Sequence, residues 1–87
     1  MKADTETFKF TFKRIKPTEL ELKTDERTFV IGIFEDSEKE DMIHAIEDFI
    51  DYELIENADC ITGSEVVGFK YNEETNTGEF EVNIFFE

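Results

Sequence analysis

Alternating apolar and polar residues near the N-terminus predict two β-strands. Three phenylalanines alternate with polar residues across residues 8–13, and two leucines alternate with glutamates across residues 18–23. A period of two is typical of a strand with one face in a core. Pro17 lies between the two segments and interrupts the pattern, so they are predicted to form a hairpin.

The same pattern predicts three further strands. Residues 28–34 carry no charge and place apolar side chains on both sides, which is typical of a strand covered at least partly on both faces. Residues 65–72 and 78–86 each alternate and flank a turn rich in Glu, Thr and Asn, which predicts a second hairpin. Residues 57–64 are predicted to connect that hairpin to the preceding element.

One helix is predicted, over residues 37–52. Ser37 is followed three residues later by Glu40, the spacing of a capping box. At 100° per residue, the apolar side chains fall on one stripe that is expected to pack on the sheet. Glu53 would enter this stripe, so the helix is predicted to end or kink within residues 52–54. The stripe consists of Met42, Ile43, Ile46, Phe49 and Ile50, with Ala45 at its edge.

These elements predict an α+β fold with the order β-β-β-α-β-β, in which one amphipathic helix packs on a mainly antiparallel sheet. Eighty-seven residues are enough for one small core and too few for two. We therefore expect a single acidic domain over residues 1–87, with residues 1–6 as a candidate disordered segment. The strand order across the helix does not follow from the pattern.

The net charge excludes more classes of function than any motif does. The chain has 23 acidic and nine basic residues, a formal net charge of −14. Direct binding to nucleic acid or to an anionic membrane depends on Lys and Arg, so we expect neither. The single Cys60 excludes an intramolecular disulfide, and no apolar segment is long enough for a signal peptide core or a membrane span. A cytoplasmic protein is the expectation.

The common catalytic and cofactor motifs are absent. There is no Gly-rich phosphate loop, nucleophile elbow or His-Glu-x-x-His sequence. Cys60 and His44 are the only residues of their kinds, and His44 falls on the solvent side of the predicted helix, away from a catalytic pairing with Cys60. Glu40, Glu47 and Asp48 lie within reach of His44, but a metal site of this kind usually takes further ligands from a facing helix, and no second helix is predicted. We expect a non-enzymatic protein without a cofactor or metal.

The acidic residues are unevenly distributed. Residues 1–24 contain four acids and six bases, whereas residues 25–57 contain twelve acids and two bases. Outward positions of the predicted helix and its entry form what we call the acidic face, the candidate partner-binding surface. The acidic face consists of Glu35, Asp36, Glu38, Glu40, Asp41, Glu47, Asp48 and Asp51.

Two interpretations of the acidic face stand side by side. Side chains three or four positions apart on a helix lie about 5–6 Å from one another, a spacing comparable with that of phosphates along a nucleic-acid strand. In size, charge and acidic helix the chain resembles the small acidic DNA mimics and anti-defence proteins of phages, and the acidic immunity proteins that block nucleases. This resemblance implies an inhibitor whose partner is a basic nuclease or nucleic-acid-binding protein. The other interpretation is a solvated polar surface that only serves solubility.

A second surface gives an alternative function. Val30, Phe34, Val66 and Phe85 are predicted to share the sheet face opposite the helix. An uncovered apolar face is typical of an assembly or regulatory subunit, including a homodimer, unless a loop covers it or the residues lie at a sheet edge. The basic residues of the first hairpin, Lys9, Lys13, Arg14 and Lys16, are expected to pair with acidic neighbours.

Overall fold

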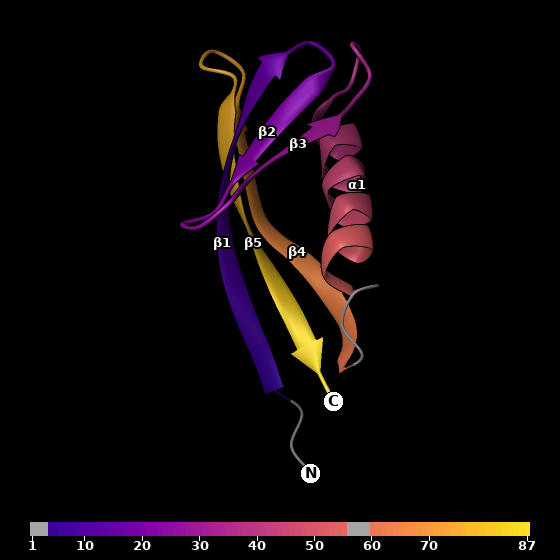
Figure 1. Cartoon of the computed structure of the whole chain (residues 1–87). Coiled ribbons are helices and arrows are strands. Elements are labelled where there is room, and N and C mark those ends of the chain that lie inside the picture. The colour runs from indigo at the N-terminus through magenta and orange to yellow at the C-terminus, as the bar shows by residue number, and fades with distance from the viewer. Residues whose placement is uncertain (1–3, 56–59) are drawn as a thin grey trace.

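The computed structural model, which describes residues 4–55 and 60–87, contains five strands and one α-helix in that part of the chain (Figure 1). Their order is the predicted β-β-β-α-β-β, and the α+β class is confirmed. A single turn of π-helix, η1, follows the α-helix. The elements are β1 Asp4–Lys16, β2 Glu19–Lys23, β3 Thr28–Gly32, α1 Lys39–Ile50, η1 Asp51–Ile55, β4 Ile61–Asn72 and β5 Thr77–Phe86.

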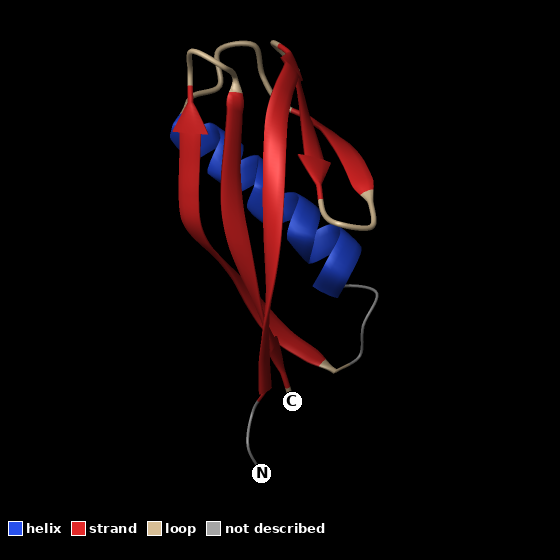
Figure 2. Cartoon of the chain, turned by 90° about the vertical axis from the view of Figure 1, so that its left-hand side faces the viewer, coloured by secondary structure: helices blue, strands red, loops and turns tan. Residues whose placement is uncertain are grey.

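The strands form one antiparallel sheet in the order β3-β2-β1-β5-β4. The predicted hairpins β1–β2 and β4–β5 are both present, and the first and last strands of the chain lie side by side in the middle of the sheet. Helix α1 crosses one face of the sheet diagonally (Figure 2). No helix of the described residues is long and apolar enough to cross a membrane.

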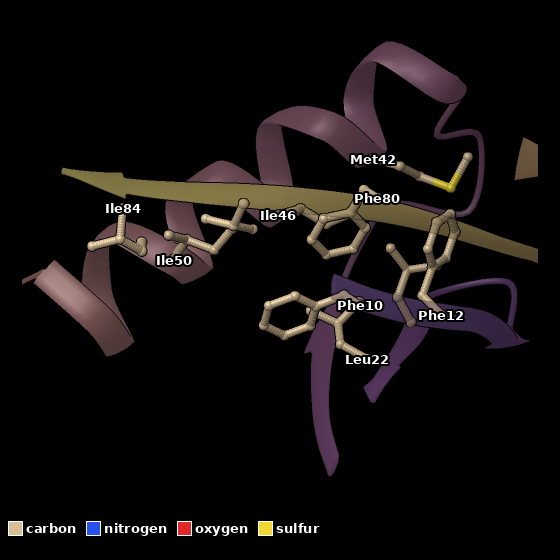
Figure 3. Packing of buried hydrophobic residues seen from close by; sticks show 10 residues of the cluster. Phe10, Phe12, Leu22, Met42, Ile46, Ile50, Phe80 and Ile84 are labelled. Atoms are coloured by element: carbon tan, nitrogen blue, oxygen red, sulfur yellow. The ribbon is translucent and has the colours of Figure 1, made fainter. Parts of the chain in front are cut away.

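The core lies between α1 and the sheet (Figure 3). The rings of Phe10 and Phe80 stack with centroids 5.0 Å apart, and Phe12 stacks on Phe69 at 5.2 Å. Burying an aliphatic or aromatic side chain contributes about 1.5–3 kcal/mol each, so this layer supplies the main driving force for folding. The buried residues are Phe10, Phe12, Leu20, Leu22, Met42, Ile46, Ile50, Phe80, Val82 and Ile84.

The helix begins with a different cap from the predicted one. Glu38 is the N-cap and forms a capping box with Asp41, whose Oδ2 accepts a 2.9 Å hydrogen bond from the Glu38 N–H. The predicted Ser37–Glu40 box is wrong because the Ser37 Oγ is already used: it accepts a 3.0 Å bond from the N–H of Phe34. The buried Ser37 therefore closes the loop before the helix. The predicted end of the helix, within residues 52–54, falls inside η1.

Strand β4 departs from the prediction in its start and its register. It begins at Ile61, inside the predicted connection. Gly68 has φ 63°, and the pairing with β5 shifts between Val67 and Lys70, as in a β-bulge. Because the extra residue reverses the alternation, Val66, which pairs with the buried Val82, packs against the core. Its predicted place on the opposite face is wrong.

The N-terminal part of β1 corrects two further expectations. Residues 4–6, which belong to the candidate disordered segment 1–6, pair with β5 from Asp4 opposite Phe86 onward; residues 1–3 lie outside the described residues. Phe8 points toward the helix side, since it pairs with the buried Val82, yet it is 42% exposed. Strand β2 pairs with β1 only from Thr11 onward, so no strand adjoins Phe8 on that side.

Candidate functional site

The acidic face is assembled by the loop after β3, the N-cap, the outer side of α1 and the first residue of η1. All eight of its residues are exposed. Lys39 is the only Lys or Arg between residues 35 and 51, and its Nζ lies 6.0 Å from the ring centroid of Phe69 in β4. Within the described residues, none of the eight carboxylates forms a salt bridge with Lys or Arg.

The acids at the start of α1 have a structural role. Asp41 accepts the hydrogen bond of the capping box, and Glu40 with Asp41 lies in the first turn. The unpaired N–H groups there give the helix a partial positive charge, which favours neighbouring carboxylates by about 0.3–1 kcal/mol each. Folding alone explains this end of the acidic face.

The acids at the other end have no comparable role. The last turn of α1 and the turn η1 contain acidic residues and no basic one. Like charges three or four positions apart on a helical backbone repel, and Asp51 lies at these distances from Asp48 and Glu47. Glu47 lies 3.5 Å from His44 Nδ1, whereas Asp48 and Asp51 have no side-chain partner among the described residues. This end of the acidic face opposes folding slightly.

Arg14 positions the loop that opens the acidic face, a role that we did not predict. Its guanidinium donates five hydrogen bonds to main-chain carbonyl oxygens rather than to carboxylates. They join the turn after β1 to the loop before α1. The acceptors are the carbonyls of Pro17 (2.8 and 3.2 Å), Phe34 (3.2 Å), Glu35 (2.9 Å) and Ser37 (3.2 Å). A guanidinium has five donors in a fixed fork. An Arg at this position is therefore the sequence feature that could have indicated this role.

The uncovered face of the sheet carries both signs of charge. Lys23 Nζ lies 3.4 Å from Glu21 Oε1, Lys9 lies 3.8 Å from Glu79, and Lys16 lies 3.9 Å from Glu19. The expected pairing of the basic hairpin residues is thus confirmed for Lys9 and Lys16.

The four residues of the predicted apolar interface do not lie together. Val66 packs against the core, and Phe34, 80% exposed, lies in the loop after β3 rather than on the sheet. Val30, in β3, is 55% exposed, whereas Phe85 is half-buried in β5, with β2 and β1 between the two strands. The structure therefore divides this candidate surface. Residues 28–34 are predicted to form a strand covered at least partly on both faces, and the side that bears Val30 is more than half exposed.

His44 and Cys60 are both exposed, in α1 and just before β4. Among the described residues, no group of three or more His, Cys, Asp or Glu side chains is arranged to hold a metal ion.

Comparison with family models, curated proteins and solved structures gives no match to this chain. The function therefore has to be argued from the surfaces themselves.

Proposed function

We propose that the protein is a non-enzymatic interaction module that presents its acidic face to a basic surface of a partner protein. The observation that carries this proposal is the C-terminal end of α1. Asp48 and Asp51 are exposed, lack a partner among the described residues and lie three positions apart on a helical backbone, where like charges repel. A surface that only needs solubility normally mixes both signs of charge, as the uncovered sheet face does.

A basic nucleic-acid-binding protein or nuclease is the partner class that such a surface fits. Carboxylates held at helical spacing present a row of negative charge to Lys and Arg side chains that otherwise contact phosphates. The module would then act as an inhibitor or nucleic-acid mimic. Association would be fast at low salt and would weaken as ions screen the charges.

The alternative, a subunit that assembles through an apolar sheet face, has less support. Its proposed surface is divided between the core, a loop and two separated strands. Apolar association also responds weakly to salt, so the salt dependence of binding distinguishes the two proposals.

Charge reversal at the C-terminal end of the acidic face tests the proposal. We expect a Glu47→Lys/Asp48→Lys/Asp51→Lys variant to lose about tenfold or more of its affinity for basic proteins captured from lysate. Added duplex DNA should displace the captured protein if the module occupies a nucleic-acid-binding site.

The matched control is Glu65→Lys/Glu73→Lys/Glu74→Lys, which changes the net charge equally at exposed positions away from α1. It should retain most of the binding. Equal losses in the two variants would show that total charge, and not the acidic face, attracts the partner. Full binding by the helix variant would rule the acidic face out.

A further inference from the structure

A groove of about 370 Å³ runs between the end of β3 and α1. Gly32, Ile33 and Ala45 line its apolar part, and Asp41, His44 and Asp48 line its helix side. The strongly exposed Phe34 lies in the same lining. The groove thus combines an apolar surface with one row of the acidic face, next to a strand at the edge of the sheet.

The open edge of β3 presents unpaired main-chain groups. The Ile33 N–H donates a 2.8 Å hydrogen bond to the Thr18 carbonyl, and the β2–β3 register continues from Gly32 opposite Glu19. Hydrogen-bonding groups of successive residues in an antiparallel strand point to alternate sides. Residues 29, 31 and 33 therefore bond toward β2, while the N–H and C=O groups of residues 28, 30 and 32 point outward.

The two outer strands of the sheet differ in how they are protected against pairing. Strand β4 contains the bulge at Gly68 and carries Glu65 and Lys70, features that discourage an added strand. Strand β3 has the sequence TFVIG, without charge, proline or bulge. The free stretch of β1 beyond β2 carries Asp4, Glu6 and Lys9. Among the described strands, β3 has the edge best suited to accept another strand.

We infer that β3 binds an extended basic segment of the partner by strand addition. This inference rests on the proposed function and specifies how the partner engages. The added strand would place alternate side chains on the helix side of the sheet, where Asp41 and Asp48 line the groove. Lys or Arg at those positions would meet both carboxylates, and the main-chain hydrogen bonds would supply affinity that salt does not remove.

Charge favours such a segment over a second copy of this chain. Two copies paired through β3 would bring close together two rows of acids that form no salt bridge with Lys or Arg among the described residues, and each copy already carries a net charge of −14. A basic extended segment is instead complementary to Asp41 and Asp48, the two carboxylates in the lining of the groove.

The test uses the whole protein and, as probe, a fluorescein-labelled peptide of alternating arginine and valine. Val30→Pro removes an outward N–H without breaking a bond to β2, because the Val30 groups point to the open edge. We expect it to weaken peptide binding about tenfold or more, whereas Val30→Thr, which keeps the N–H and the β-branched shape, should stay within about twofold.

Amide hydrogen exchange of the unaltered protein provides a second readout that does not depend on the folding of a variant. Saturating peptide should slow exchange about tenfold or more at Thr28, Val30 and Gly32. Ile31 and Ile33, already bonded to β2, are the internal controls. Unchanged exchange at the three outward amides, or equal affinities of the proline and threonine variants, would overturn strand addition.

These outcomes are separable from failure of the proposed function. If charge reversal on α1 abolishes partner capture but Val30→Pro does not weaken it, the acidic face acts without strand addition and the inference is wrong. Sedimentation of the free protein as a dimer that Val30→Pro dissociates would assign the edge to a second copy and also overturn the inference.

Discussion

The uncovered face of the sheet and the acidic face of the helix are both exposed, yet they handle charge differently. On the sheet, Lys9, Lys16 and Lys23 each lie within 4 Å of a glutamate carboxylate. On the helix, no carboxylate of the acidic face pairs with Lys or Arg among the described residues, and Lys39 lies over a phenylalanine ring. Eight of the 23 acidic residues are therefore gathered on one surface without a Lys or Arg partner, and this is the surface that we propose a partner binds.

Arg14 connects the two regions, and its removal is expected to have the largest effect on stability. Arg14→Met keeps the aliphatic stem and deletes all five hydrogen bonds, so it should lower the free energy of unfolding by about 2–3 kcal/mol in urea denaturation. The lysine variant should recover less than half of this loss because one ammonium cannot reach four carbonyls.

Arg27→Met is the matched control. The Arg27 guanidinium lies 5.1 Å from the Phe29 ring centroid and is exposed, so its loss should cost about 0.5–1 kcal/mol. If Arg14→Met destabilises the protein no more than Arg27→Met, the five hydrogen bonds of Arg14 to main-chain carbonyls do not contribute to stability.

The sequence predicted the elements better than it predicted their edges and faces. Alternation located the hairpins and the 3.6-residue period located α1, because both patterns are set by the burial of one face. The bulge at Gly68 could not be foreseen: one extra residue moved Val66 to the core side, and glycine alone does not reveal where a bulge falls.

The other features that the sequence did not predict depend on contacts between residues far apart in the chain. Serine is a common N-cap residue, but the Ser37 hydroxyl accepts a hydrogen bond from the Phe34 N–H instead. Both residues lie in a loop that Arg14, in β1, binds through main-chain carbonyls. The helical period alone could place Glu40, Asp41, Glu47, Asp48 and Asp51 on the outside, whereas the other three acids of the acidic face precede the helix. The position of β3 at the edge of the sheet could not be predicted, because it depends on a strand order that the pattern does not specify.

Alanine substitutions at the two ends of α1 should have the next largest effects on the free energy of unfolding, and these effects should be opposite in sign. Asp41→Ala loses a cap and a favourable charge, so the free energy of unfolding should fall by about 1 kcal/mol. Asp51→Ala removes repulsion from Glu47 and Asp48 and should raise it by about 0.5 kcal/mol at low salt.

Because the substitution is the same, the helix propensity of alanine is common to both variants. The gain at Asp51 should shrink as salt is added. A loss of stability at both positions would mean that the C-terminal acids serve folding, and the main support for a binding role would disappear.

The smallest expected effect belongs to the sheet. Lys23 and Glu21 are both on the uncovered face, with side chains 56% and 27% exposed. A double-mutant cycle with Lys23→Gln and Glu21→Gln should give a coupling free energy below about 0.5 kcal/mol, since exposed pairs are weakened by solvent and by side-chain entropy. A coupling well above 1 kcal/mol would show that the paired charges of the sheet contribute to folding. The paired charges of the sheet would then serve stability, whereas the acidic face would serve the proposed binding.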